Sequence, residues 1–437
     1  MRHRSGRQGA VPEPGPSCGP GTGGTYQGQL VTPEEALAAA DDLADPAEHP
    51  LAVNAWWPQS LAHGVPGVAL LHVEAAAAGL RSWDRVHRWL RLAARAPVTA
   101  GSSAGSWYGA PALAYVMGRT AAARPGAYRS ALESLDVQIT HDVRYRVALA
   151  HQRIDAGRLP LMAEFDALRG LSGLGALLLH RDPGGPVVRE VLGYLVRLAL
   201  PVTHDGTVVP GWWTPTAPTG RRDDRGFPGG HANLGMAHGV GGPLALMALA
   251  LLRGVEVPGQ REAVAALCAW LDDWRLDTST GARWPYMVTR SELHARPARV
   301  EHCGATRRPS WCYGTFGAAR VHQLAGIALG DRGRQQLAES ALLGALRDPA
   351  QLGTTTDGSL CHGHAGLARI TSRAAQSASG PTAGALRARC GDHLLAAGTA
   401  GAGPGLLEGA AGSALAALAP LTGGQPVTAW DACLLIT

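Results

Sequence analysis

The chain has 437 residues, of which 46% are hydrophobic and 17% charged, so it can bury a large core. All of its 39 basic residues are arginines, and the net charge of +5 is spread along the chain rather than gathered into the patch expected of a nucleic-acid-binding protein. No apolar run approaches the roughly 18 residues that span a bilayer, and seven cysteines at irregular spacings do not suggest a disulfide framework, so we expect a cytoplasmic protein without an integral membrane segment.

Residues 1–30 are rich in Gly, Pro and Ser and lack the apolar region of a secretory signal, so we expect a disordered tail. The pattern changes at Thr32, where Pro33 and two glutamates follow in the manner of a helix start. Ala- and Leu-rich stretches with helical spacing follow at 68–80, 127–137, 187–200, 244–253, 261–272 and 336–346. Alternating β-branched runs are scarce, and we predict one all-α domain over residues 31–437.

A short motif, Gly-x-x-Gly leading into an apolar helix, recurs along this domain. Its first glycines are Gly64, Gly170, Gly239, Gly314, Gly363 and Gly409, and a seventh copy at Gly109 has Ala112 in place of the second glycine. The mean spacing of about 58 residues suits a hairpin of two helices and two loops. Seven hairpins can stack as an open solenoid or close into a ring. Because closure leaves no terminal apolar face and creates a central cavity, we predict a closed α/α toroid.

Three copies of the motif carry groups that can bind a soft metal just before the first glycine. They are Cys312, the pair Cys361 and His362, and His238. If the motifs lie at one level of the ring, these side chains can converge at one mouth. Two thiolates and one imidazole form a good ligand set for Zn²⁺ and leave a fourth tetrahedral position open. Such a formally neutral centre suits activation of a thiol better than activation of water.

Spacing alone leaves other interpretations of these residues open. A buried cysteine is ordinarily a small hydrophobic residue, and the cysteines at 312 and 361 are 49 positions apart. Cys303, beside His302, and His364 are competing ligand candidates. We place Cys18 in the tail and expect three other cysteines to lie in the core: Cys268, Cys390 and Cys433.

An ordered set of longer motifs resembles the LanC family of lanthipeptide cyclases. The motifs are FDALRGLSGLG (165–175), PGWW (210–213), GGHANLGMAHGVGG (229–242), RPSWCYGTFG (308–317) and LCHGHAG (360–366). The resemblance runs from about residue 50 to the C-terminus. It implies an α/α toroid of seven inner and seven outer helices, in agreement with the repeat count. It also implies a zinc-dependent enzyme that adds peptide cysteine thiols to dehydroalanine or dehydrobutyrine, forming lanthionine and methyllanthionine rings.

The resemblance implies a role for each matching residue. Cys312, Cys361 and His362 match the ligands of one zinc ion per chain. His238 matches the proposed acid/base residue, and Asp166 matches an aspartate that could hold and polarise it. Arg308 and Tyr313 match two further active-site positions. The addition generates an enolate that needs nearby positive charge and a proton, which an arginine and a histidine can supply.

Each catalytic assignment has a structural alternative. Asp166 could cap a helix or form a salt bridge, Tyr313 could simply pack, and Arg307 competes with Arg308. Trp212 and Trp213 could line a peptide groove or pack within a loop.

The segment around His63 repeats the AHGVxG pattern around His238 almost letter for letter. The repeats alone do not show which histidine acts. The resemblance selects His238, and we interpret His63 as structural or supporting.

The leading hypothesis is a standalone cyclase. It implies a dehydrated precursor peptide with its leader and a separate dehydratase as partners, and it is compatible with peripheral membrane association through a biosynthetic complex. An alternative is a LanC-like zinc protein that binds peptides or thiols as an adaptor without cyclising them. A glycosidase on the same fold would need a pair of acidic residues in the cavity, whereas these motifs offer sulfur and imidazole.

Overall fold

The computed structural model describes residues 32–48, 57–222, 224–295, 308–396 and 403–437 (for 392–396 the backbone alone). The predicted tail at 1–30 lies outside this part, as do Cys18, Cys303 and Arg307. Helix α1 (Pro33–Asp42) begins as predicted, because Thr32 and Glu35 each accept a hydrogen bond from the other's backbone N–H, at 3.2 and 2.7 Å.

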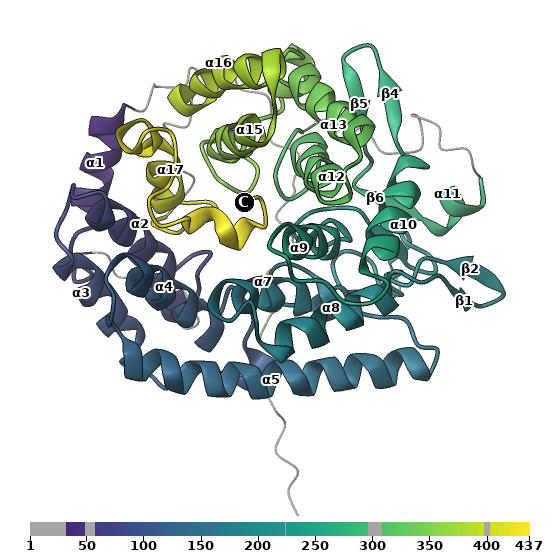
Figure 1. Cartoon of the computed structure of the whole chain (residues 1–437), viewed down its shortest axis with the longest axis horizontal. Helices are drawn as coiled ribbons and strands as arrows, with labels where there is room; N and C mark the ends of the chain where they lie inside the picture. Colours follow the sequence, from purple (N-terminus) through teal and green to yellow (C-terminus); the bar gives the residue numbers. More distant parts are fainter. Residues whose placement is uncertain (1–31, 49–56, 223, 296–307, 397–402) are drawn as a thin grey trace, which may run out of the picture.

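Seven helices line the inside of a ring, and each begins one or two residues after a motif glycine (Figure 1). They are α2 (Val65–Ala77), α4 (Ala110–Ala123), α7 (Leu171–Arg181), α9 (Gly241–Leu252), α12 (Thr315–Leu329), α15 (His364–Ser377) and α17 (Ala410–Ala417). Each inner helix contacts the next, and α17 contacts α2, which closes the ring. Helices such as α9 are apolar on all sides because every side is covered.

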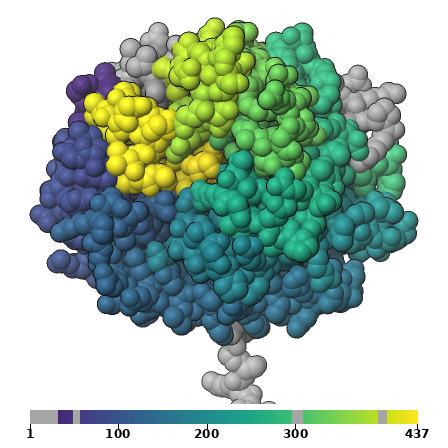
Figure 2. Space-filling view, in the orientation of Figure 1, coloured from purple at the N-terminus to yellow at the C-terminus, as the bar shows by residue number. Residues whose placement is uncertain are grey.

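A second helix packs outside each inner one. These outer helices are α3 (Asp84–Ala93), α5 (Arg129–Asp155), α8 (Pro186–Leu198), α10 (Gln260–Asp272), α13 (Arg332–Ala345) and α16 (Gly380–Ala396), with α1 packed on α17. The closed α/α toroid predicted from the repeats is therefore confirmed. In Figure 2 the purple-to-blue start and the yellow end of the chain lie side by side where the ring closes. None of the helices that the structure describes is long and apolar enough to cross a membrane.

Short strands interrupt the described part of the chain between α8 and α11 (Arg290–His294). They pair as antiparallel two-stranded sheets: β1 (Val202–His204) with β2 (Thr207–Val209), β3 (His231–Asn233) with β6 (Met287–Thr289), and β4 (Leu276–Thr278) with β5 (Gly281–Arg283). The all-α prediction missed them because each has only three residues. The short helices α6 (Met162–Phe165) and α14 (Pro349–Leu352) lie in other connections.

The C-terminal segment, residues 430–436, enters the middle of the ring (Figure 1). Its backbone carbonyls accept hydrogen bonds from Tyr115 of α4 (2.8 Å), Trp311 (2.9 Å) and Arg320 of α12 (3.0 Å). Its Asp431 pairs with Arg369 of α15, and both side chains are buried. The segment thus ties three inner helices together and fills part of the cavity that ring closure creates.

Backbone hydrogen bonds join the seven motif loops into a closed belt. In each bond the acceptor is the carbonyl of the second residue before a first glycine, and the donor is an N–H of the preceding loop. The bonds run from Leu61 to Trp107 (2.8 Å), Trp107 to Leu168 (3.3 Å), Ala167 to Ala237 (3.0 Å), Met236 to Cys312 (2.9 Å), Cys312 to Cys361 (3.2 Å), Leu360 to Leu407 (3.0 Å) and Leu406 to Ala62 (2.8 Å). The belt therefore holds equivalent residues of all seven repeats at one level.

The motif glycines are required because the backbone folds closely onto itself within each loop. A Cβ on the first glycine, Gly314, would lie 2.1 Å from the carbonyl oxygen of Arg308. A Cβ on the second glycine, Gly317, would lie 2.2 Å from the carbonyl oxygen of Trp311. Both distances are far inside van der Waals contact with backbone that cannot move aside, so any side chain would force the loop open.

We expect Gly317→Ala to lower the free energy of unfolding by about 1–3 kcal/mol, as overpacking typically does. Gly193→Ala is a matched control, because Gly193 lies inside α8 with nothing within 4 Å of its Cβ position. Since alanine is favoured over glycine in a helix, that change should be neutral or stabilising by up to about 1 kcal/mol. Guanidinium unfolding curves measure both, and equal stability of the two variants would contradict the close-approach argument.

Candidate active site

The residue before each first glycine is polar in all seven loops and at least partly exposed to solvent. These mouth residues are His63, Tyr108, Arg169, His238, Tyr313, His362 and Glu408. Because they occupy the same position in loops joined by the belt, they surround one mouth of the ring. Four of them, His63, His238, Tyr313 and His362, were candidates from the sequence, whereas Tyr108, Arg169 and Glu408 were missed. Aligning the seven motifs on their first glycines would have revealed the whole set.

The three predicted zinc ligands meet at this mouth. One ligand atom from each of Cys312, Cys361 and His362 lies within 4.8 Å of the others, and the described residues contain no other such cluster of three His, Cys, Asp or Glu. The belt causes this, since the N–H of Cys312 donates to the carbonyl of Cys361. His364 is not part of the cluster.

The donor set of this cluster fits zinc. Ligand atoms in a tetrahedral zinc site lie roughly 3.3–3.8 Å apart, given Zn–S of about 2.3 Å and Zn–N of about 2.0–2.1 Å. Side chains already within 4.8 Å need only small rotations to reach that spacing. Cys312 is buried whereas Cys361 and His362 are partly exposed, so the cluster opens toward the mouth.

Hydrogen bonds within the cluster favour loss of a thiol proton. The hydrogen bond from Cys361 lowers the pKa of Cys312 against the opposing effect of burial, with help from His362 and Ser310. Burial opposes the charged form of His362, but Asp357 and Cys312 together raise its pKa to about 10. Because a metal needs thiolates and an unprotonated ring nitrogen, metal binding at this cluster must release protons.

Next to the cluster, His238 forms a pair with Asp166. The imidazole Nδ1 lies 2.7 Å from Oδ2 of Asp166. The other carboxylate oxygen accepts three backbone N–H groups, from Leu168 (3.1 Å), Arg169 (2.6 Å) and Gly170 (2.8 Å). The side chain of Asp166 is 1% exposed and that of His238 is 37% exposed. A buried carboxylate, fixed by three backbone hydrogen bonds, therefore binds a histidine whose ring is in contact with solvent.

The environment of His238 favours its charged form. Burial of the ring works against protonation, but the hydrogen bond to Asp166 and the charge of that carboxylate raise the pKa of His238 above its ordinary value. The carboxylate of Asp166 also binds backbone N–H groups of the loop ahead of α7. Helix α7 itself, with Gly170 at its N-cap, receives no hydrogen bond from a capping side chain, so the structure gives the helix-capping alternative no support. One oxygen of Asp166 thus fixes the loop, and the other pairs with His238.

Tyr313 and Arg308 lie on either side of Cys312 in the chain. The phenol oxygen of Tyr313 accepts a hydrogen bond from Nδ2 of Asn233 at 3.1 Å. Burial raises the pKa of Tyr313, which therefore stays a neutral hydrogen-bond donor. The positive charge of Arg308 acts on the thiol of Cys361 and partly offsets the influences that raise the pKa of that thiol, first among them the hydrogen bond to Cys312.

Three other residues discussed from the sequence have different surroundings. His63 stacks on Trp57, with ring centroids 5.9 Å apart and planes inclined by 20°. Burial lowers the pKa of His63, and the charge of Glu408 only partly compensates. Trp212 and Trp213 are both buried, which favours the loop-packing interpretation over a peptide groove.

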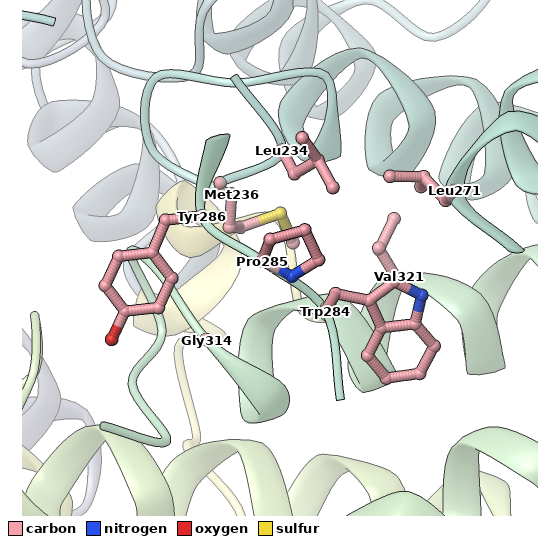
Figure 3. A pocket seen from close by; sticks show the side chains of 10 residues that line it. Leu234, Met236, Leu271, Trp284, Pro285, Tyr286, Gly314 and Val321 are labelled. Atoms are coloured by element: carbon pink, nitrogen blue, oxygen red, sulfur yellow. The ribbon is translucent and has the colours of Figure 1, made fainter. Parts of the chain in front are cut away.

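A small cavity lies behind the loop that carries His238 (Figure 3). It is lined mainly by apolar side chains, among them Leu234, Met236 and Trp284, and it has room for about one water molecule. The cavity is too small for a peptide side chain. It is therefore a packing defect of the core rather than a binding pocket for a peptide.

Comparisons with known proteins show what this chain is similar to. The model of the lanthionine synthetase C-like protein family matches residues 55–435. The nisin biosynthesis protein NisC of Lactococcus lactis subsp. lactis is 22% identical over 249 residues, which are 56% of this chain and 56% of that protein. The match thus spans about half of that relative. A solved structure of nisin cyclase superposes with a TM-score of 0.72 at 19% identity, covering 92% of this chain and 96% of that one.

We expect Asp166→Asn to lower the pKa of His238, because the amide keeps the backbone contacts but removes the negative charge that favours the imidazolium. His238 would then lose its proton at a lower pH than in the unchanged protein. Histidine NMR titration measures this. Glu408→Gln is the control: it should lower the pKa of His63 and leave that of His238 in place. An unchanged His238 titration in Asp166→Asn would refute the assigned pairing.

Proposed function

The chain belongs to the lanthionine synthetase C-like family, and from that premise we propose that it is a zinc-dependent lanthipeptide cyclase. The observation that carries the proposal is the convergence of Cys312, Cys361 and His362 beside the pair of His238 and Asp166. The reaction is the addition of a peptide cysteine thiol across the double bond of dehydroalanine or dehydrobutyrine. It forms lanthionine or methyllanthionine.

In this proposal Cys312, Cys361 and His362 hold one zinc ion per chain. A zinc ion held there by two thiolates and one imidazole would be able to take a substrate thiol as a further ligand and would favour its deprotonation. The partial exposure of Cys361 and His362 lets a peptide reach that position from the mouth.

The other site residues stabilise the negative charge of the enolate and supply the proton for its α-carbon. The thiol loses its proton, its sulfur bonds to the β-carbon, and the electron pair of the double bond moves toward the neighbouring carbonyl as an enolate. Arg308 supplies fixed positive charge near the reacting sulfur, and the neutral phenol of Tyr313 can donate to the enolate oxygen. Imidazolium of His238, stabilised by Asp166, gives the α-carbon its proton. The thiol proton passes to solvent and His238 regains a proton from solvent, so the net reaction is an isomerisation of the peptide.

The wider setting is part of the same proposal. Residues 31–437 act as one cyclase domain, a separate dehydratase supplies the dehydrated precursor peptide, and the reaction takes place in the cytoplasm. An adaptor that binds peptide without cyclising it would not need a carboxylate held by three N–H groups behind a solvent-reaching histidine. That arrangement favours the enzyme.

We expect the isolated protein to contain about one zinc ion per chain, which Cys312→Ala and Cys361→Ala each lose because two ligands hold the ion far less tightly than three. Cys268→Ala is the matched control, since that thiol is buried in α10 away from the cluster and should leave the metal content unchanged. Inductively coupled plasma mass spectrometry measures the zinc content per chain of each variant. Full zinc content in both ligand variants would refute the site.

Incubation with a dehydrated precursor peptide should remove free thiols without changing the peptide mass, because the addition only rearranges atoms. Alkylation followed by mass spectrometry counts the remaining thiols. His238→Ala should slow the loss by about 10²–10⁴-fold, the usual contribution of a general acid, whereas His63→Ala should stay close to the unchanged protein. If wild-type protein binds the peptide but leaves every thiol free, it is an adaptor and the cyclase proposal is wrong.

A further inference from the structure

Two motif loops at the mouth share a feature that the family motifs did not single out. The sixth residue before the first glycine is Asn233 in one loop and Asp357 in the other. In both, the side-chain Oδ1 accepts the N–H two residues on, at 2.9 Å for Asn233 and 2.7 Å for Asp357. In both, the backbone carbonyl accepts the N–H seven residues on, at 2.9 Å.

The glycine of each loop leaves room for this side chain. A Cβ on Gly239 would lie 2.5 Å from Oδ1 of Asn233, and a Cβ on Gly363 would lie 2.3 Å from Oδ1 of Asp357. The first glycine therefore does more than permit a tight turn. Because it has no Cβ, Oδ1 of the Asn or Asp can lie close to the backbone and bind an N–H there. The other terminal atom of that side chain then has a fixed direction.

In both loops the second terminal atom is directed at a proposed site residue. Nδ2 of Asn233 donates to the hydroxyl of Tyr313 at 3.1 Å. Oδ2 of Asp357 lies 3.3 Å from Nε2 of His362. Each side chain has a partner of complementary hydrogen-bonding type. The amide NH₂ of Asn233 is a donor and faces a phenol oxygen, whereas the carboxylate of Asp357 is an acceptor and faces an imidazole N–H.

We propose that Asp357 is a positioning residue for the metal centre, which holds His362 in the tautomer that has its proton on Nε2 and leaves Nδ1 to bind the metal. The inference rests on the proposed zinc site. A ligand histidine needs one nitrogen without a proton, and a carboxylate on the other nitrogen fixes both the tautomer and the ring orientation. Asn233 is the counterpart on the opposite side of Cys312, where it makes the phenol an acceptor and leaves the phenol proton to point elsewhere.

The replacement Asp357→Asn changes one atom and isolates this role. An asparagine keeps Oδ1 for the N–H of Ser359, so the turn survives, but it presents an NH₂ group to Nε2 of His362. The imidazole then either faces donor against donor or moves its proton to Nδ1, where it blocks the metal. Either outcome weakens binding of the metal without removing a ligand.

A second carboxylate near the same ring provides the control for charge. Glu408 lies 3.9 Å from Nδ1 of His362 and is 43% exposed, compared with 27% for Asp357. Glu408→Gln removes the same charge from the same neighbourhood but leaves the contact at Nε2 intact. Asn233→Asp is the reciprocal exchange in the equivalent loop, and it should leave zinc affinity unchanged.

The experiment is zinc affinity by competition with a chromogenic chelator, on the full chain at one pH, with thermal unfolding of each variant. We expect 10–100-fold weaker zinc binding in Asp357→Asn, and less than about threefold change in Glu408→Gln and Asn233→Asp. Unchanged affinity in Asp357→Asn would overturn the inference. An equal loss in Glu408→Gln would overturn it too, because charge rather than orientation would then explain the effect.

A measurement on the unchanged protein covers the case in which Asp357→Asn does not fold. Long-range ¹H–¹⁵N NMR of the zinc-loaded protein reports the tautomer of His362. A proton on Nε2 agrees with the proposal, and a proton on Nδ1 contradicts it. If the wild-type chain binds no zinc at all, the proposed metal centre itself is wrong, which differs from a zinc site that is indifferent to Asp357.

Discussion

The belt of backbone hydrogen bonds between motif loops is the constraint on which the rest of the structure depends. Backbone groups carry no sequence information, yet the belt brings Cys312 to Cys361 across 49 positions of chain because both are the second residue before a first glycine. Most of the motif glycines make the belt feasible, since a Cβ at positions such as Gly314 and Gly317 would collide with backbone atoms. The repeat therefore builds the helical ring and also determines where the residues of the site lie.

Two buried carboxylates of the ring, Asp431 and Asp166, differ in the partners that balance their charge. Asp431 is buried in the centre, where Arg369 and Arg373 overcome the effect of burial and lower its pKa to about 2. Two permanent cations make that pairing independent of pH near neutrality. Asp166 is equally buried, but its partners are three backbone N–H groups and His238. In this second arrangement the hydrogen bond to Asp166 and its charge raise the pKa of His238, which favours the imidazolium form that the proposed proton donor needs.

Features that repeat or have a strong composition could be predicted from the sequence, whereas features that depend on contacts between repeats could not. The hairpins and the closed ring follow from the motif and its spacing, whereas the family resemblance was needed to select Cys312, Cys361 and His362 among the candidate ligands. The strands escaped prediction because three residues give too short a pattern. The C-terminal segment inside the ring escaped it because its apolar residues look like any core sequence. Asp357 was missed because its role is visible only once Gly363 and His362 are placed around it.

His63 and His238 show most directly why the motif alone does not determine function. Their own loops are nearly identical in sequence, and the difference lies in the loop that precedes each one in the belt. For His238 that loop supplies Asp166, four residues before its first glycine. For His63 the equivalent position, four residues before Gly409, is Gly405, and a Cβ there would lie 2.6 Å from the Cα of His63. No carboxylate can occupy that equivalent position, and the charge of Glu408 only partly offsets the burial that lowers the pKa of His63, whereas the pKa of His238 is raised. The chemistry of a mouth histidine is thus decided by its neighbouring repeat.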